Sequence, residues 1–562
     1  MLLPVLLAPI VAFVGLAQGA KLPVVDLGYG LHQAIGYNGT FDFYNFSNIR
    51  YARPPTGSLR FTAPQPPLTN RTVQDGSSGG TCPQSYPVWY LCGLALLSGS
   101  ITSTASCDAG LIPKPEPTEQ EDCLFLDVIV PKQIFPNASA KHATGAPVMV
   151  WVYGGGFTFS KMYQDGNPAG LIQRSREEDP SGKGVIYVTF NYRGGAFGFL
   201  SGPNVQSNGT ANAGLLDQRM ALEWVQQYIH LFGGDPKQVT VFGQSAGAGS
   251  IMHQITAYAG LKGPAPFQRA ILQSPGFEPF PSHWEQDNLL QRYLGLLNVS
   301  TIQEARGLPF AALSAANVEL VASSPYGTFT FAPTVDGDLV PSLPGNLLAQ
   351  GNYDTTVQIM TGFNTHETLY FTDPDSTNNS IFLSSITGTF PGIQPSVANY
   401  VAETLYPPIF NGSYPYTSFY ERAELTLQES AFTCNTFFLQ TAAARKLKNP
   451  AADYGYRFSV PPAYHGQDVA YTYYNPATAG ASVNATIALL MQRALTRFAL
   501  TGNPNRKGDA PSTVMPVYQD QNQSQGAAAA GKILDLNVTG LTVIADPNDN
   551  DRCRWWQKSL YY

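Results

Sequence analysis

The stretch "VTVFGQSAGAGS", residues 239–250, places one serine among small residues directly after a run that favours a strand. Its first four residues are β-branched or aromatic and predict a buried strand, and the small residues after Ser245 can begin a helix. At such a strand-turn-helix corner the serine backbone is strained and its hydroxyl is exposed, while Gly243 and Gly247 let neighbouring segments approach closely. We therefore predict that Ser245 is a nucleophile.

The same short pattern, G-x-S-x-G, occurs a second time at residues 76–80, within "TVQDGSSGGTC". Polar residues and glycines on both sides indicate a loop, and no strand leads into it. A pattern this short arises by chance in a chain that holds 53 glycines. We interpret Ser78 as a chance match.

Further apolar runs predict the strands of a sheet, at residues 147–155, 184–192, 238–243, 269–274, 356–363 and 454–460. They are continuous rather than alternating, as expected for strands that are buried on both faces of a mostly parallel sheet. The segment 216–234 between two of them has a helical pattern, with an apolar side made of Leu216, Met220, Leu222 and Val225 and with Gly233 as its stop. The predicted fold class is α/β, a large mostly parallel sheet flanked by helices.

Composition excludes several classes of function. The net charge is −7, only 13% of the 562 residues are charged, and no run of Lys or Arg is present. Neither nucleic acid nor an anionic membrane is therefore an expected partner. We find no clustered Cys/His spacing and no phosphate-binding loop, so we expect no metal and no cofactor. No linker or internal repeat divides the chain, which predicts a single domain over residues 20–562. No oligomeric state is predicted.

The first 19 residues are apolar and end in small residues, which predicts a signal peptide and a secreted protein. No later stretch is long and apolar enough to span a bilayer. Six cysteines follow, an even number that suits disulfides in an oxidising compartment. N-x-S/T sequons predict a glycosylated surface, with candidates at Asn38, Asn45, Asn70, Asn137, Asn208, Asn298, Asn378, Asn411, Asn484, Asn522 and Asn537.

An activated serine needs a base, and the base needs an acid that orients it. In one known arrangement these follow the serine along the chain in the order acid, then histidine. Of the seven histidines, five precede Ser245 or follow it too closely: His32, His142, His230, His253 and His283. His465, in the loop "PPAYHGQD" after a predicted strand, is the expected base, and His366 is the alternative.

The acid has more than one candidate on sequence order. Glu367, in "TGFNTHETLYF", lies just past the predicted strand 356–363. Asp336 and Asp338, in "VDGD", compete with it and would pair with His366. The order of the residues alone does not exclude them.

Consecutive glycines at residues 154–156 follow another predicted strand, in "VMVWVYGGGF". Glycines in this place let backbone N–H groups point inward without obstruction by side chains. Together with the N–H group of Ala246, they would make a three-donor oxyanion hole that stabilises a tetrahedral intermediate.

Several long motifs together resemble the type B carboxylesterases, the group that includes cholinesterases and fungal lipases: "EDCLFLDV", "VMVWVYGGGF", "NYRGGAFGFL", "NAGLLDQRMALEWV" and "FGGDPKQVTVFGQSAGAGS". The similarity covers nearly the whole mature chain. It implies an α/β-hydrolase fold with helical insertions over the active site. By this resemblance Ser245, Glu367 and His465 match the catalytic triad, and Gly155, Gly156 and Ala246 match the oxyanion hole.

The resemblance implies a serine carboxylic-ester hydrolase that acts through an acyl-enzyme on a small or medium organic ester. The fungal side of the resemblance suggests a role in secondary metabolism. Transfer of the acyl group to another alcohol stays an alternative reaction. From another class of function, a non-catalytic adhesion protein shares this fold, but such proteins have lost the serine, and this chain keeps all three triad matches.

The resemblance also implies two disulfides, Cys82–Cys123 and Cys434–Cys553. Cys92 and Cys107 are then left to pair inside the first loop, in the region that forms the lid of related fungal lipases. A disulfide that closes a short loop restricts its movement, which favours a soluble ester over an interfacial lipase. The segment "VWYLCGLALL" (88–97) is apolar enough to meet lipid, although its simplest interpretation is a packed flap. An interfacial lipase is therefore the alternative enzyme.

Two departures from the family pattern bear on the substrate. The family often has Glu before the nucleophile, whereas this chain has Gln244. The tryptophan with which cholinesterases hold a quaternary ammonium has no counterpart in "GLIPKPEPTEQ". A cationic choline ester is therefore not the expected substrate.

Overall fold

The computed structural model describes residues 22–135, 145–446, 453–480, 482–510, 513–518 and 531–562. The predicted signal peptide and two of the sequon asparagines, Asn137 and Asn522, lie outside these residues. The other sequon asparagines are all partly or fully exposed. Among the described helices, none combines the length and the apolar character needed to cross a membrane.

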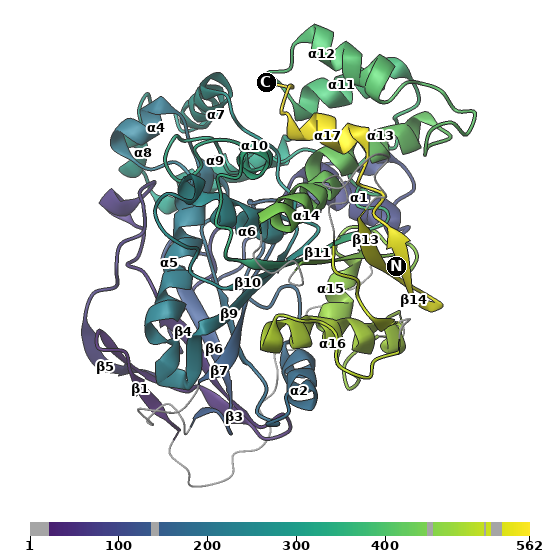
Figure 1. Cartoon of the computed structure of the whole chain (residues 1–562). Coiled ribbons are helices and arrows are strands. Elements are labelled where there is room, and N and C mark those ends of the chain that lie inside the picture. Colours follow the sequence, from purple (N-terminus) through teal and green to yellow (C-terminus); the bar gives the residue numbers. More distant parts are fainter. Residues whose placement is uncertain (1–21, 136–144, 447–452, 481, 511–512, 519–530) are drawn as a thin grey trace.

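An eleven-stranded sheet runs through the molecule in the order β14-β13-β12-β11-β10-β9-β7-β8-β6-β4-β3 (Figure 1). From β8 to β13 the neighbouring strands are parallel, and the strands at both ends are antiparallel. The bounds are β3 Gly36–Asn38, β4 Phe43–Arg50, β6 Phe125–Pro131, β7 Ala146–Val152, β8 Ile186–Phe190, β9 Gly234–Gln244, β10 Arg269–Gln273, β11 Gln358–Asn364, β12 Asp453–Phe458, β13 Lys532–Asn537 and β14 Gly540–Ala545. A small separate sheet holds β1 Val24–Asp26, β2 Gly30–Gln33 and β5 Asn70–Gln74.

The predicted α/β class and the predicted parallel centre of the sheet are confirmed, since β7 to β12 overlap the six apolar runs. The antiparallel strands on both sides were not predicted. Edge strands such as β14 are only half buried, so they lack the continuous apolar run that marks a central strand. β6 is buried throughout but carries an aspartate, Asp127, in its middle.

Helices pack on both faces of the sheet (Figure 1). On one face α6 Ala246–Thr256 contacts β9 and β10, and α14 Cys434–Lys446 contacts β11 and β12. On the other face α2 Ala169–Glu178 packs against α16 Ala485–Thr501, which contacts β7 and β9. The remaining helices of the described chain are α3 Gly195–Phe199, α4 Pro203–Asn208, α7 His283–Leu296, α8 Ile302–Arg306, α9 Phe310–Ala322, α10 Pro344–Gln350, α11 Asn379–Thr389, α12 Pro395–Tyr400, α13 Phe419–Gln428, α15 Gln467–Thr472 and the three introduced below.

The helix predicted at 216–234 is α5, Ala213–Tyr228, followed by a short 3₁₀ turn that ends at Gly233 in the left-handed conformation, φ 88°. The predicted apolar side is partly wrong. Leu216 and Met220 are only half buried, whereas Leu215 is fully buried. The buried face is shifted because it includes Asp217, a polar residue that an apolar pattern cannot mark.

Arg193 explains why Asp217 is buried. Its guanidinium donates two hydrogen bonds of 2.7 Å to the carboxylate of Asp217, and both side chains are almost fully buried. The pair therefore joins α5 to the segment after β8 within the core.

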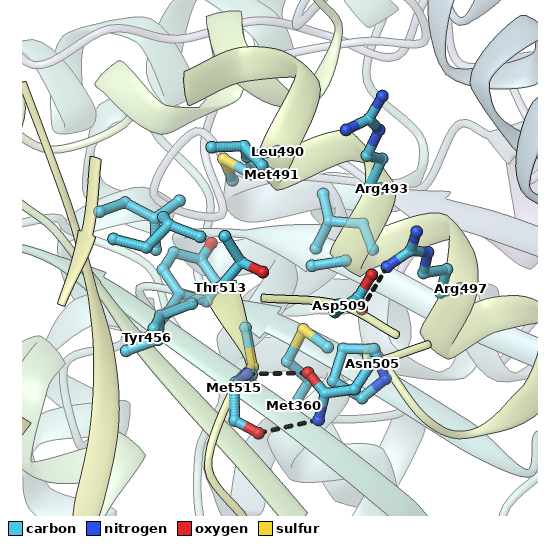
Figure 2. Close-up of a pocket in the computed structure, with 16 residues that line it drawn as sticks. Met360, Tyr456, Leu490, Met491, Arg493, Arg497, Asn505, Asp509, Thr513 and Met515 are labelled. Atoms are coloured by element: carbon cyan, nitrogen blue, oxygen red, sulfur yellow. Dashed lines mark hydrogen bonds and ion pairs between the residues drawn. The ribbon is translucent and has the colours of Figure 1, made fainter. Parts of the chain in front are cut away.

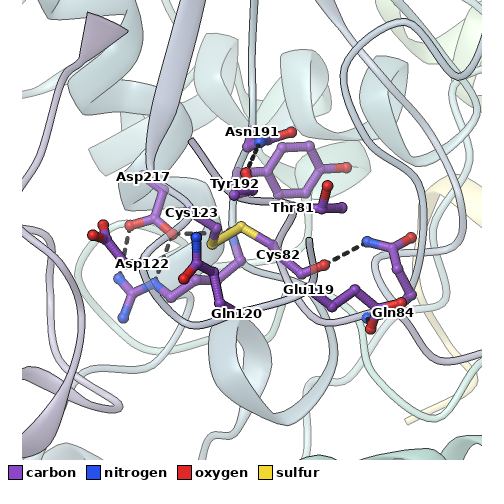
Figure 3. Close-up of a disulfide and its surroundings, with 12 residues drawn as sticks. Thr81, Cys82, Gln84, Glu119, Gln120, Asp122, Cys123, Asn191, Tyr192 and Asp217 are labelled. Carbon is purple, nitrogen blue, oxygen red and sulfur yellow. Dashed lines mark hydrogen bonds and ion pairs between the residues drawn. A yellow bond between two sulfur atoms is a disulfide. The ribbon is translucent and has the colours of Figure 1, made fainter. Parts of the chain in front are cut away.

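The structure contains the three disulfides Cys82–Cys123, Cys92–Cys107 and Cys434–Cys553. Figure 3 shows the first of them, close to Gln84. The Gln84 side chain donates to the carbonyl groups of Cys82 and Ser160 and accepts from the N–H group of Ser160. The disulfide thus anchors the segment that follows the three consecutive glycines. The last disulfide ties α17, Asp551–Gln557, to α14.

The segment expected to form a packed flap is helix α1, Val88–Leu97. Trp89 is buried there, its indole N–H donates to the carbonyl of Thr328 at 2.7 Å, and its ring contacts Phe329 and Phe371. Cys92, in the middle of the helix, is bonded to Cys107. Two independent restraints therefore hold α1 against the rest of the fold.

Candidate active site

Ser245 stands between the end of β9 and the start of α6, as the strand-turn-helix pattern predicts. Its φ is 58° and its ψ is −128°, a strained conformation for a residue with a side chain. The surrounding chain holds this conformation through its backbone. The N–H group of Ser245 donates to the carbonyl of Gln273 at 3.0 Å, and its carbonyl accepts from Gly249 and Gly276.

Gly247 shows why small residues surround the serine. A Cβ atom at this position would lie 2.1 Å from the carbonyl oxygen of Val152 at the end of β7. At Gly243 the corresponding distance, to the same oxygen, is 2.5 Å. Neither contact is tolerable, so β7 could not approach the turn if these residues had side chains.

His465 lies in the loop after β12 and contacts Glu367, which follows β11. The distance from His465 Nδ1 to Glu367 Oε2 is 2.5 Å, and both side chains are buried. Because β11 and β12 are parallel neighbours, both residues emerge at the carboxyl edge of the sheet. Ser245 leaves the same edge from β9. The fold thus brings the three predicted residues to one place.

Glu367 is fixed by more than the histidine. Its other oxygen, Oε1, accepts hydrogen bonds from the backbone N–H of Asn364 at 2.5 Å and from the hydroxyl of Ser274 at 2.6 Å. Its own N–H group donates to the side chain of Gln428. A carboxylate held on both oxygens can orient an imidazole without moving itself.

The alternative acid and base are not brought together. Asp336 accepts from backbone N–H groups of its own turn, and Asp338 is paired with Lys262. His366 lies 3.1 Å from Glu424, is half exposed, and has a pKa that the hydrogen bond with Glu424 raises. Neither aspartate makes a hydrogen bond or an ion pair with a histidine within the described part of the chain.

Gln244 occupies the position where the family often has Glu, and it contacts His465, the candidate base. Its Nε2 lies 3.0 Å from Nε2 of His465. We assign the tautomer in which His465 Nδ1 donates to Glu367 and Nε2 accepts from Gln244, because an amide nitrogen can only donate. Over the described residues, the hydroxyl of Ser245 makes no hydrogen bond with His465, and the amide of Gln244 is the partner of Nε2.

The glycines predicted for the oxyanion hole lie in the loop after β7. Gly155 has φ 85° and Gly156 has φ 58°, both in the left-handed region that favours glycine. Ala246 is the first residue of α6, where N–H groups have no partner within the helix. In the described structure none of these three N–H groups has an acceptor, so all three are available to a ligand.

A small cavity opens beside Ser245 and holds about 20 Å³ of free space. Gly156 and Ala246 line it, together with aromatic rings from Phe277, Phe329, Phe371 and Phe432. The last two rings also contact the imidazole of His465, with centroids 5.2 and 4.6 Å away. Among the lining residues Glu278 is the one carboxylic acid. The site is therefore apolar except for the nucleophile, the backbone donors and this residue.

A larger cavity of about 140 Å³ lies under α16, against β11 to β13, and Figure 2 shows its lining. In its wall the carboxylate of Asp509 pairs with Arg497, and the side chain of Asn505 is hydrogen-bonded to the backbone of Met515. None of the catalytic candidates lines it. The candidate active site is therefore the smaller cavity, which Ser245 lines.

Sequence reasoning missed several residues that support the site. Asp468, three residues after the histidine, is fully buried and accepts from Gln273, Asn364 and Tyr456. Burial raises the pKa of its carboxyl. "HGQD" contains this aspartate, which lies in the first turn of α15, but a single acidic residue carries no sequence signal of burial. Ser274, Gln428 and Glu278 were missed because a single polar residue likewise carries no sequence signal of the distant segments that pack against it.

Comparisons with known proteins identify the family of this chain. The model of the Carboxylesterase family matches residues 29–532. The chain is 42% identical over 561 residues to carboxylesterase patB of Penicillium expansum, a match that covers 96% of each protein. It is 31% identical over 458 residues to a secreted lipase of Arthroderma benhamiae, which covers 78% of this chain and 83% of that relative.

Among solved structures, EstA of Aspergillus niger has a TM-score of 0.77 at 26% identity, over 96% of this chain and 98% of that one. The structural neighbours are esterases with the α/β-hydrolase fold. Because the family model and these matches extend over nearly the whole chain, this protein belongs to the carboxylesterase family.

Proposed function

We propose that this protein is a secreted serine carboxylic-ester hydrolase that forms an acyl-enzyme on Ser245. The observation that carries the proposal is the buried pair of Glu367 and His465, 2.5 Å apart, at the sheet edge where the strained serine stands. This combination of nucleophile, base and orienting acid is what acyl transfer requires.

In the first half of the reaction the Ser245 oxygen bonds to the ester carbonyl carbon while its proton passes to Nε2 of His465. The negative oxygen of the tetrahedral intermediate is held by the N–H groups of Gly155, Gly156 and Ala246. The intermediate then expels the alcohol, which takes the proton from His465. Glu367 keeps the imidazole in the required tautomer.

In the second half a water molecule gives its proton to His465 and attacks the acyl carbon. The acid leaves as the proton returns to Ser245. Gln244 must give up its hydrogen bond to Nε2 in each half, because that nitrogen carries the transferred proton.

A short acyl group fits the proposal, since the cavity beside Ser245 holds about 20 Å³ of free space and is walled by rings. The substrate would be a small or medium organic ester. Carboxylesterase patB proteins of Penicillium and Aspergillus are among the relatives, and we extend the proposal to a role in fungal secondary metabolism.

Secretion is supported by the three disulfides, by the exposure of the described sequon asparagines and by relatives that are named secreted lipases. Those relatives also favour the second candidate function, an interfacial lipase. The packing of α1 by Trp89 and by the Cys92–Cys107 disulfide argues for the esterase.

Two experiments test the proposal. Ser245→Ala should abolish hydrolysis of p-nitrophenyl butyrate, while Ser78→Ala, at the chance match of the same pattern, should leave it unchanged. An active Ser245→Ala enzyme would refute the mechanism. Rates on tributyrin, measured through its solubility limit, separate the candidates: smooth saturation supports the esterase, and an abrupt rise at the limit supports the lipase.

A further inference from the structure

Glu278 lines the same small cavity as Ser245, and the proposed mechanism leaves it without a role. It lies in the segment between β10 and α7 and is only 8% exposed. The rest of the cavity wall is aromatic or aliphatic apart from the serine. A carboxyl group in such surroundings is costly unless it has a partner.

Comparison with the other buried glutamates shows that Glu278 is unusual. The remaining four of the described chain are each paired with a basic side chain: Glu121 with Arg60, Glu367 with His465, Glu424 with His366, and Glu429 with Arg552. Glu278 has no basic partner among the described residues. Its carboxyl is thus uncompensated in charge.

One oxygen of Glu278 is occupied and the other is free. Oε1 accepts from the backbone N–H of Phe329 at 2.7 Å. Oε2 has no hydrogen-bond partner in the described structure. Burial raises the pKa of this carboxyl well above its ordinary value, against the opposing effect of the Phe329 N–H group. Burial therefore favours the neutral acid, and its O–H group is a hydrogen-bond donor on a residue that lines the cavity.

A purely structural role would need only Oε1, which ties the segment after β10 to Phe329. A glutamine would do this equally well and would avoid the cost of burying an acid. The free oxygen beside the nucleophile indicates a ligand.

We propose that Glu278 selects the substrate by donating a hydrogen bond to an oxygen atom in its acyl group. The inference rests on the proposed function and names its substrate class: esters whose short acyl chain carries an ether, hydroxyl or carbonyl oxygen. The acyl group is the part assigned to the cavity because it stays bonded to Ser245 in the acyl-enzyme, while the alcohol must leave.

The test uses two esters of equal shape, p-nitrophenyl methoxyacetate and p-nitrophenyl butyrate, which differ by one ether oxygen in place of a methylene. The measured quantity is the ratio of kcat/KM for the first ester to that for the second, in wild type and variants. Differences in chemical reactivity between the esters cancel when the ratios are compared between enzymes.

Glu278→Leu removes the donor, and its ratio should fall about tenfold, because a site built to hydrogen-bond an oxygen loses one such bond. Glu278→Gln should stay within about threefold of wild type, since its oxygen must accept from Phe329 and its NH₂ group then replaces the O–H donor. Glu285→Leu, which removes a partly buried carboxyl outside the cavity, is the matched control and should leave the ratio unchanged.

A Glu278→Leu enzyme whose ratio stays within about twofold of wild type would overturn the inference, because loss of the Phe329 bond alone lowers both rates alike. If Glu278→Leu does not fold, the test rests on Glu278→Gln. A fall of about tenfold in the kcat/KM ratio of Glu278→Gln, methoxyacetate over butyrate, then overturns the inference. The proposed function fails separately, if Ser245→Ala still hydrolyses either ester.

Discussion

Replacing Glu367 by Gln tests the proposed acid directly, because the structure predicts how the amide must lie. Oε1 accepts from the backbone N–H of Asn364, and this donor cannot turn away. The amide oxygen is therefore held at the Oε1 position, and the NH₂ group takes the Oε2 position, 2.5 Å from His465 Nδ1 in the wild type. Nδ1 must then accept, so the proton of the imidazole moves to Nε2.

A protonated Nε2 cannot take the proton of Ser245. A carboxylate-to-amide change that imposes the wrong tautomer typically costs about four orders of magnitude in kcat. This corresponds to about 5.5 kcal/mol of barrier, at roughly 1.4 kcal/mol for each factor of ten. The assay is kcat for p-nitrophenyl butyrate, with the concentration of folded enzyme determined independently by its circular dichroism and melting curve.

The chain supplies two controls. Glu424→Gln changes the other histidine-glutamate pair, at half-exposed His366, and should leave kcat within about twofold of wild type. Ser274→Ala removes one of the two donors to Oε1 but keeps the Asn364 N–H, so kcat should fall by about tenfold or less. The reasoning is refuted if Glu367→Gln retains more than about a tenth of the wild-type kcat.

Three further predictions concern stability. Replacing Cys92 and Cys107 together by serine should lower the free energy of unfolding by about 3 kcal/mol in a denaturant titration, because the disulfide joins residues 15 apart in sequence. An unchanged denaturation midpoint would show that α1 is held by packing alone. Burial raises the pKa of Asp546 to about 6, so ionisation of its carboxyl destabilises the folded state progressively as pH rises through about 4 to 6. Asp546→Asn should therefore raise the free energy of unfolding by about 3 kcal/mol at pH 8, or Tm by about two to three degrees, and should leave both unchanged below about pH 4. Equal increases at the two pH values would contradict the pKa shift. Asp217→Ala leaves the buried guanidinium of Arg193 without its ion-pair partner, so the free energy of unfolding should fall by about 3–5 kcal/mol in the same denaturant titration. A fall of less than about 1 kcal/mol would mean that water reaches the arginine.

Local patterns in the sequence were enough to predict the centre of the fold. Each of the strands β7 to β12 is a short apolar run that is buried on both faces, and such a run is visible without knowledge of its neighbours. The same holds for the turn at Ser245, where the strand, the small residues and the start of α6 are contiguous. The half-buried edge strands were not predicted, because their burial depends on which segments pack against them.

The contacts between the site residues depend on how the strands are ordered in the folded sheet. His465 and Glu367 are 98 residues apart in sequence, and they meet because β11 and β12 are neighbours in the sheet. Chain order left Asp336 in competition with Glu367; the difference is that the turn of Asp336 binds its own backbone N–H groups.

Glu278 illustrates the same limit at the substrate cavity. As one acidic residue in "PGFEPF" it has no signal in the sequence, and it becomes notable only where aromatic rings from distant segments surround it. Residues close along the chain were therefore enough for the central strands, the strand-turn-helix corner at Ser245 and the family resemblance. The contact of Glu367 with His465, the contact of Gln244 with the same histidine and the polar group of the cavity were set by packing, since each depends on segments that only the folded sheet brings together.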